Sequence, residues 1–503
     1  MSGEPDSPHR WPPRLRAVVV VAFVIGSVMV LRDQAMHEPV MVVGDGWEYW
    51  YQAESFHRHF SPELRASDVA AINDAAASLG IGPAPEDPYA YVTAPDGRLF
   101  SQHFWAYGLS AVPAKMCLPW FGINELTCLQ VTNALWMILA IGVTLFASRS
   151  PVGERLALAG LATVGPVLHY VNWQGAEMFS WSLGLMGVVA FREGRYGWAG
   201  LASGLAATQN PPAVFLGAAA VLAATWQGRW RTAVWAFAGT AISLIPFAFI
   251  QYHFGRPSLI VGGVEYAGIS NLSWVRTWGF LTDFNHGLLP YAPMLVIGLV
   301  IATVRLVWKR NARGLFLVLG GVGMMIGTEV AHNWNSGCDG LQRYLVWMIP
   351  VAAGVVVEGA GSVRRLLAFA AVAVLVHSLI IYELRRTHAL WGGHLAHTPL
   401  AGWVLNEVPE LYWIEPEVFV ERCERYDGWP HVPANFPVTF VRDDGTVSKM
   451  LLDAASVDEL AARYEVDPAY LSVIRERVSG VRGPFFANPP RDTVRVRPEA
   501  KRE

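Results

Sequence analysis

Charged side chains are scarce in this chain. Of its 503 residues, 16% are Asp, Glu, Lys or Arg, against about 25% in ordinary soluble domains. The deficit is uneven, because between Leu15 and Leu384 the charges gather in short clusters that separate long apolar runs. This pattern excludes an ordinary soluble domain for that region and predicts a mainly α-helical, polytopic membrane protein.

Long apolar runs are absent from the last part of the chain. Residues 385–503 are charged and rich in proline and polar side chains, so we expect a separate soluble domain there. Within it, Pro437–Val441 followed by Asp443-Asp444-Gly445 predicts a strand and a turn, and Val457–Tyr464 predicts a short helix. The domain is therefore expected to be α+β.

Cysteine is also rare, with 4 residues in the chain. This number is too small for a disulfide framework. Cys338 and Cys423 would both lie outside the cytoplasm in the topology described below, so a bridge between them is one alternative. Spacing cannot establish it, and unpaired thiols are the simpler expectation.

The apolar runs themselves predict the membrane topology. The first, Ala17–Leu31, follows Arg10, Arg14 and Arg16 and has no small-residue cleavage site after it, which favours an uncleaved span with a cytoplasmic N-terminus over a signal peptide. Further runs occupy residues 126–147, 156–171, 179–191, 198–209, 213–226, 233–252, 292–307, 315–331, 344–357 and 366–382. About eleven spans would place the two chain ends on opposite sides of the membrane.

Basic residues support this orientation. They cluster in the connections predicted to share a side with the N-terminus: Arg149 and Arg155, Arg192 and Arg195, Arg229 and Arg231, Arg305 with Lys309, Arg310 and Arg313, and Arg364 with Arg365. The positive-inside rule makes that side cytoplasmic. The opposite side would receive the loop at residues 32–124, the later loops near residues 172–177, 256–290 and 333–342, and the C-terminal domain.

Two interruptions in the pattern point to specific local structure. Gln209-Asn210-Pro211-Pro212 separates two half-length apolar runs, as expected of a broken helix that is covered by protein or lines a cavity. Pro95-Asp96-Gly97 separates two β-prone runs and predicts a hairpin turn, because proline presets φ and glycine accepts a positive φ. The hairpin belongs to the first external loop, which is too long for a passive connection.

That loop opens with a pair of carboxylates among aromatic residues, in Gly44-Asp45-Gly46-Trp47-Glu48-Tyr49-Trp50. A carboxylate at a membrane surface can take a proton from an attacking hydroxyl, while an arginine or a metal ion stabilises a departing phosphate. We therefore predict that Asp45 is a catalytic base and Glu48 its helper. The simpler alternatives are a solvated loop carboxylate and a helix cap.

Other polar residues of the external side are candidates for substrate binding. They are His103, Glu177, Asp283, His286 and Arg343. The guanidinium of Arg343 matches the oxygens of a phosphate. The alternatives are structural: a snorkelling arginine for Arg343, a helix cap for Glu177 and an interface histidine for His103.

A divalent cation, Mg²⁺ or Ca²⁺, is an alternative cofactor. It requires Asp45, Glu48 and Asp339 to converge, since hard cations prefer oxygen ligands. Nothing in the spacing of these residues forces that arrangement, so we name no certain cofactor.

The order of these motifs resembles the GT-C superfamily of integral-membrane glycosyltransferases, which includes protein mannosyltransferases and lipid A aminoarabinose transferases. The similar stretches are Gly44–Tyr49, Asp96–His103 continuing to Gly108 and Pro113, Glu177, Asn285–Pro293, and Asn333–Tyr344. The resemblance covers about residues 15–385. It departs from the family in the last stretch, where Gly-Leu-Gln-Arg-Tyr replaces the commoner Gly-Pro-Arg-Tyr.

The resemblance implies transfer of a sugar from a polyprenyl-phosphate donor to a hydroxyl of a glycan, lipid or protein acceptor, with inversion. It implies an enzyme of the plasma (inner) membrane that contacts membrane lipid and no nucleic acid. A transporter or flippase for a lipid-linked sugar is the alternative, and the broken helix at Pro211-Pro212 would suit it. Against it, the polar residues gather at one membrane face rather than at mid-depth.

Overall fold

The computed structural model describes residues 11–36, 45–82, 90–163, 165, 167–260, 267–331, 334, 340–386, 395–413, 415–425, 436–479 and 484–497. Contacts divide the chain into two compact units. The bundle unit comprises Met1–Asn271, Ala292–Val330 and Arg343–Ile381, and the C-terminal unit comprises Leu272–Tyr291, Ala331–Gln342 and Tyr382–Glu503. The longest segment of the C-terminal unit, Tyr382–Glu503, begins close to the predicted boundary at residue 385. The unit also includes the two earlier segments, which the sequence did not indicate.

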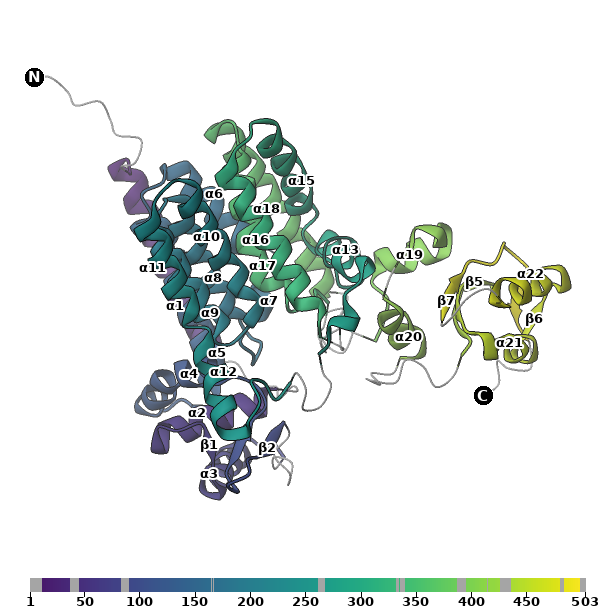
Figure 1. Ribbon diagram of the computed structural model, residues 1–503, viewed down its shortest axis with the longest axis horizontal. Helices are drawn as coiled ribbons and strands as arrows, with labels where there is room; N and C mark the ends of the chain where they lie inside the picture. The colour runs from purple at the N-terminus through teal and green to yellow at the C-terminus, as the bar shows by residue number, and fades with distance from the viewer. Residues whose placement is uncertain are drawn as a thin grey trace, which may run out of the picture. The chain divides into compact units, whose positions relative to one another are not determined.

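Helices that run side by side form the bundle unit (Figure 1). Every predicted apolar run falls on one of these helices or on a consecutive pair. They are α1 (Pro13–Met36), α5 (Cys128–Gly142), α6 (Val152–Thr163), α7 (Val167–Tyr170), α8 (Glu177–Arg192), α9 (Tyr196–Ala207), α10 (Val214–Trp226), α11 (Trp230–Ala241), α12 (Leu244–Phe254), α15 (Pro293–Trp308), α16 (Ala312–Glu329), α17 (Leu345–Gly359) and α18 (Val363–Arg386).

Several of these helices are long and apolar enough to cross a membrane. In the described part of the chain 4 qualify, within Pro13–Met36, Glu125–Ala147, Ala312–Glu329 and Val363–Leu384, and the pair α11 and α12, bent by 41°, makes a fifth if counted as one span. Shorter apolar helices occur at Pro211–Trp226, Pro293–Trp308 and Leu345–Gly359. The expected polytopic helical membrane protein is confirmed, while the total of about eleven includes helices below this length.

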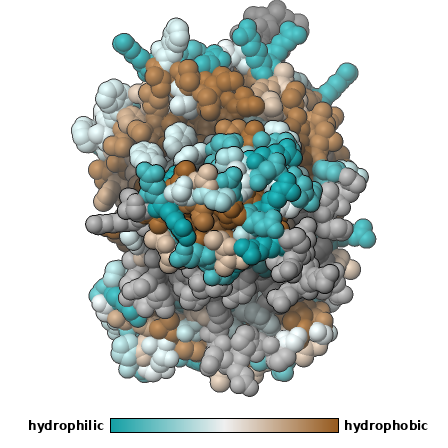
Figure 2. Space-filling view, turned by 90° about the vertical axis from the view of Figure 1, so that its right-hand side faces the viewer, coloured by the Kyte–Doolittle hydropathy of each residue, from teal (hydrophilic) through white to brown (hydrophobic). Residues whose placement is uncertain are grey.

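Exposed apolar side chains mark the lipid-facing surface of the bundle. Val24 on α1, Phe237 on α11 and Val304 on α15 are all exposed. Figure 2 shows hydrophobic side chains in brown over much of the upper part of the view, at the height of the bundle helices in Figure 1. In water such a surface would mark an interaction site or an aggregation hazard. In a bilayer it is the ordinary surface that faces the lipid chains.

The interruption after α9 is a genuine break in the helix. α9 ends at Ala207, a short 3₁₀ turn spans Pro211–Ala213, and α10 follows. Side chains satisfy groups at the break: Ser203 Oγ donates to the Ala213 carbonyl at 2.6 Å, Asn210 Nδ2 donates to Ser180 Oγ at 2.6 Å, and Gln209 Nε2 donates to the Tyr49 hydroxyl at 3.3 Å. The break therefore packs against the first external loop.

The first external loop folds into its own small α/β layer at one end of the bundle (Figure 1). Its elements are α2 (Gly46–His59), β1 (Glu63–Leu64), α3 (Ala66–Ser78), β2 (Tyr91–Thr93), β3 (Leu99–Ser101) and α4 (Ala106–Cys117), with the strands antiparallel in the order β1-β3-β2. The predicted hairpin is confirmed, since Gly97 has φ +85° and Ala94 N donates to Arg98 O at 2.7 Å. Trp50, Tyr51 and Tyr107 bury their rings between this layer and α5.

The C-terminal unit is α+β, as expected. It contains α13 (Trp274–Thr282), α14 (Leu288–Tyr291), α19 (Pro399–Glu407), α20 (Pro416–Glu424), β4 (Val438–Val441), β5 (Val447–Leu452), α21 (Val457–Arg463), β6 (Tyr464–Val466), α22 (Pro468–Ser479), β7 (Phe485–Ala487) and β8 (Val494–Val496). The strands form antiparallel sheets ordered β4-β5-β7 and β6-β8. The predicted strand and helix correspond to β4 and α21.

Hydrogen bonds explain why the loop segments join this unit. Arg276 Nη2 of α13 pairs with Glu415 Oε1 at 2.8 Å, and Trp334 N donates to Glu417 Oε2 at 3.1 Å. Cys117, Cys128 and Cys423 are free thiols. Cys338, the other half of the bridge considered above, lies outside the described residues.

Candidate active site

Asp45 is the residue immediately before α2, at the N-cap position of that helix. An aspartate there normally caps the helix by accepting a backbone N–H, but Asp45 makes no such bond. Its Oδ2 instead accepts from Arg343 Nη1 at 2.8 Å, although 298 residues separate them. Gly46, the next residue, packs against Gln174, since a Cβ there would lie 2.6 Å from Gln174 Oε1 and 3.2 Å from Gln174 Cβ.

Arg343 lies just before the first turn of α17 and reaches two carboxylates. Besides the hydrogen bond to Asp45, its Nε is 3.8 Å from Glu177 Oε1. Its guanidinium carbon lies 5.3 Å from the centre of the Tyr344 ring. The three charged side chains come from the starts of α2, α8 and α17, and each is at most 17% exposed. The structure thus brings three of the candidate residues, Asp45, Glu177 and Arg343, together.

Glu48 is fully buried one turn into α2, where it is held by the segment after β3. His103 Nδ1 lies 2.6 Å from Glu48 Oε2, the His103 backbone N–H donates to Oε1 at 3.1 Å, and the Ser101 hydroxyl donates to the same oxygen. A carboxylate with this many partners is fixed in place. His103 is the more accessible member of the pair, at 23% exposed.

Glu177 is buried at the start of α8, ahead of the apolar run that begins at Phe179. Its Oε2 has no hydrogen-bond partner among the described residues. Burial raises the pKa of Glu177 to about 7, against the opposing charge of Arg343. Gly175 makes room for this carboxylate, because a Cβ there would collide with Oε2. Glu177 is therefore a group that changes charge near neutral pH.

Charges in the site shift two further pKa values. Burial alone would raise the pKa of Asp45, but the positive charges of Arg343 and His103 lower it instead. Burial alone would lower the pKa of His103, but Glu48 and Asp45 raise it to about 9. At neutral pH the site therefore holds two ion pairs, Asp45 with Arg343 and Glu48 with His103, beside a Glu177 that is partly protonated.

One group of ligands in the described residues could hold a metal ion. Oxygen or nitrogen atoms of Asp45, Glu48 and His103 all lie within 4.8 Å of one another. A cation bound there would compete with Arg343 for Asp45 and with the imidazole proton of His103 for Glu48. Asp339, named above as a further ligand, lies outside the described residues.

Asp283 and His286 belong to the C-terminal unit. Asp283 Oδ1 accepts the backbone N–H groups of Asn285 and His286, each at 2.7 Å, and burial raises the pKa of Asp283 to about 6. His286 bonds through Nδ1 to Gly340 O at 2.6 Å and through Nε2 to Arg422 Nη2 at 2.9 Å. These contacts join three segments of that unit, and the predicted role in substrate binding stays a prediction.

A solved structure is similar to part of this chain. It is ArnT from Cupriavidus metallidurans bound to undecaprenyl phosphate, with a TM-score of 0.44 and 13% sequence identity over 68% of this chain and 60% of that one. This chain therefore matches less than two thirds of the length of ArnT. No family model and no curated protein matches the sequence.

Three further residues of the site were not singled out from the sequence. Both amide atoms of the buried Gln174 lack a hydrogen-bond partner among the described residues, although it lies against Gly46. Ser101 holds Glu48, and Gln209 accepts from Tyr107 N at 3.0 Å while donating to Tyr49. Gln174 and Gln209 are polar residues beside apolar runs, which was the available signal.

Proposed function

We propose that this protein is a membrane glycosyltransferase that moves a sugar from a polyprenyl-phosphate donor to an acceptor hydroxyl on the extracytoplasmic face of the plasma membrane. The observation that supports it most is the Asp45–Arg343 pair, at 2.8 Å. In this proposal Asp45 is the base, Arg343 is the phosphate ligand, and their contact at the predicted membrane surface supports both roles.

The donor phosphate competes with Asp45 for Arg343. Arginine binds phosphate oxygens through two parallel N–H groups, which makes the phosphate a stronger partner than a single carboxylate oxygen. Because Arg343 is the main cause of the low pKa of Asp45, its transfer to the phosphate raises that pKa. Binding of the donor thus converts a paired carboxylate into a base.

The chemical step then balances as a displacement. The acceptor oxygen forms a bond to the anomeric carbon while the bond from that carbon to the phosphate oxygen breaks, and Asp45 takes the hydroxyl proton. The polyprenyl phosphate leaves with the electron pair, and Arg343 stabilises the charge that it gains. A carboxylate close to the anomeric carbon also stabilises the positive charge that develops there.

Glu48 and His103 act together in this scheme. Glu48 fixes the imidazolium of His103, whose raised pKa keeps it charged at neutral pH. A charged, partly accessible His103 beside Asp45 is suited to donate a hydrogen bond to a second oxygen of the donor phosphate. Glu48 is thus a positioning residue rather than a second base, which sharpens its predicted role as a helper.

A divalent cation is the alternative way to neutralise the phosphate, through Asp45, Glu48 and His103. Transfer activity after dialysis against EDTA separates the alternatives. The ion-pair scheme predicts unchanged activity, while a metal-dependent enzyme loses activity and regains it with Mg²⁺ or Ca²⁺.

Purified protein incubated with a panel of polyprenyl-phosphate sugars tests the proposal. The expected result is that one donor is hydrolysed or transferred, with release of polyprenyl phosphate measured by mass spectrometry. A flippase would move the donor across a vesicle membrane without breaking it. Translocation of an intact donor, without hydrolysis or transfer, would therefore contradict the glycosyltransferase proposal and support the transporter alternative.

A further inference from the structure

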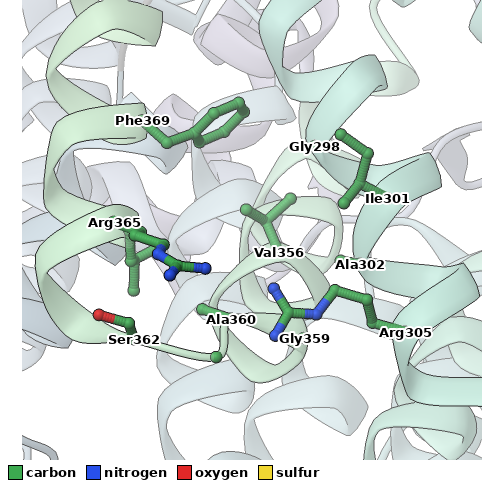
Figure 3. A pocket seen from close by; sticks show the side chains of 12 residues that line it. Gly298, Ile301, Ala302, Arg305, Val356, Gly359, Ala360, Ser362, Arg365 and Phe369 are labelled. Atoms are coloured by element: carbon green, nitrogen blue, oxygen red, sulfur yellow. The ribbon is translucent and has the colours of Figure 1, made fainter. Parts of the chain in front are cut away.

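A pocket of about 160 Å³ lies at one end of the bundle, between α15, α17 and α18 (Figure 3). Its lining combines apolar side chains with two arginines. Arg305 comes from the last turn of α15 and Arg365 from the first turn of α18, with Ile301, Val356 and Phe369 among the apolar residues. The proposed reaction uses none of these residues.

The two arginines face each other across the pocket. In Figure 3 their guanidinium groups point toward one another from opposite sides, and the Phe369 ring lies on the wall above them. Within the described residues neither guanidinium has a hydrogen bond or an ion pair. The nearby Glu358 is engaged elsewhere, with Arg313 Nη2 at 2.5 Å and Arg192 Nε at 3.6 Å. The pocket therefore carries uncompensated positive charge.

Close packing of the helices builds this shape. A Cβ on Gly298 would lie 2.7 Å from the Phe369 ring, and one on Gly359 would lie 2.6 Å from the Ala302 Cβ. A Cβ on Gly361 would collide with the Arg305 guanidinium. The glycines thus bring the three helices together while leaving the arginine head free over the α17–α18 connection.

The pocket is distinct from the candidate active site. Arg343 precedes α17, whereas Gly359 ends it, and the helix has 15 residues. At 1.5 Å per residue the two ends are about 22 Å apart. The positive-inside rule assigns the pocket end to the cytoplasmic leaflet.

We propose that this pocket binds the phosphate headgroup of an anionic phospholipid. The two guanidinium groups neutralise the phosphate, and the positive end of the α18 dipole adds to their charge. One acyl chain lies along Phe369 and the exposed apolar face of α18, where Val372 and Leu375 are open to the bilayer. Anionic lipid of the cytoplasmic leaflet attracts basic side chains at this depth.

Titration of the full-length protein in detergent with short-chain phosphatidylglycerol tests the proposal, with the rise in melting temperature giving an apparent affinity. Arg305→Gln and Arg365→Gln should each weaken that affinity about tenfold, since each removes a charged hydrogen bond. Arg364→Gln is the matched control, because Arg364 is exposed in the same turn but does not line the pocket. It should change the affinity by less than about twofold.

Comparison ligands identify the occupant. Phosphatidylcholine and inorganic phosphate should stabilise the protein far less than phosphatidylglycerol. Equal stabilisation by inorganic phosphate would show that the pocket binds a free anion and not a lipid. Equal stabilisation by phosphatidylcholine would show that the negative charge of the lipid does not determine binding. An Arg364→Gln effect as large as that of Arg365→Gln would reduce the site to diffuse surface attraction.

The test does not depend on the proposed reaction. Asp45→Asn protein, which lacks the proposed base, should bind phosphatidylglycerol as the unaltered protein does. Both positions are at least partly exposed, so we expect Arg305→Gln and Arg365→Gln to fold. The melting temperature of each variant without lipid checks this.

Discussion

Arg343 is shared between two carboxylates of different character, and that sharing controls the site. Asp45 is ionised and hydrogen-bonded to it at 2.8 Å, whereas Glu177 lies at 3.8 Å and has a pKa of about 7. The guanidinium is thus fully paired at high pH and only half paired at low pH. The donor phosphate must compete with whichever carboxylates are charged.

Substitution of Arg343 separates charge from shape. Arg343→Lys keeps the positive charge but loses the planar fork that matches phosphate, so kcat/KM should fall about 10- to 100-fold, as expected for loss of one charged hydrogen bond of about 1.5–3 kcal/mol. The kcat/KM of Arg343→Gln should fall further, because this variant also loses the positive charge. Steady-state kinetics with the identified donor measures both, and a fully active lysine variant would contradict two-point binding of the phosphate.

Glu177 gives a pH dependence with a defined sign. As pH rises through about 7 its carboxylate becomes charged and competes with the donor phosphate for Arg343. The KM for the donor should therefore be constant below about pH 6 and rise between pH 7 and 8.5. Glu177→Gln should abolish this rise, and a KM profile that is the same in both proteins would remove Glu177 from donor binding.

The same residue affects stability. The pKa of Glu177 in the folded protein, about 7, lies above its ordinary value of 4.5, so the folded state holds a proton that the unfolded state releases. The associated stability is fully present below about pH 4.5 and is lost as pH rises through 7. Glu177→Gln should melt at a higher temperature than the unaltered protein at pH 8, with a smaller difference at pH 5.

At the scale of the elements, the start of α2 is fixed by contact with the turn before α8. A methyl group at Gly46 would lie 2.6 Å from Gln174 Oε1 and 3.2 Å from Gln174 Cβ. Rotation of the amide relieves only the first contact, so Gly46→Ala should displace Asp45 from Arg343. Misplacement of a reacting group by about 1 Å can cost roughly 100-fold in rate. We expect Gly46→Ala to lose at least tenfold in turnover.

A matched glycine makes this prediction specific. Gly26 in α1 has nothing within 4 Å of an added Cβ, so Gly26→Ala should leave turnover and melting temperature nearly unchanged. Equal turnover in Gly46→Ala and Gly26→Ala would show that the start of α2 need not be held tightly.

Elements were predicted from sequence more reliably than their pairing. The apolar runs, the Pro95-Asp96-Gly97 turn and the broken helix at Pro211 each follow from local chemistry, and each is confirmed. The approach of Asp45 to Arg343 depends on packing across 298 residues, which no local pattern encodes. The predicted topology placed Arg343 and Glu177 on the external side, and the family resemblance supported them, but neither gave a sign of Gln174.

At the scale of the whole molecule, the sequence predicts which end of the bundle faces the cytoplasm. Impermeant maleimide applied to intact cells should label Ser67→Cys in α3 but not Gln227→Cys beside the basic pair Arg229 and Arg231, in a background in which Cys117, Cys338 and Cys423 are replaced by serine. Both substituted positions are exposed. Permeabilised cells should label both, and the reverse pattern in intact cells would invert the topology.

The division into units was the part of the whole-molecule organisation that sequence did not predict. Composition separated the spans from residues 385–503, because burial of apolar surface in lipid leaves a clear signal. It gave no reason to assign Leu272–Tyr291 and Ala331–Gln342 to the C-terminal unit. Those segments join it through side-chain pairs such as Arg276 with Glu415, which cannot be read along the chain.

The measurement that tests the central claim most directly is single-turnover transfer by Asp45→Asn, together with its affinity for the donor. Loss of a general base should slow transfer about 10²- to 10⁴-fold. Since the substitution also frees Arg343 from its 2.8 Å partner, donor affinity should be unchanged or tighter. Transfer at the rate of the unaltered protein, or loss of donor binding in place of the chemical step, would contradict the account.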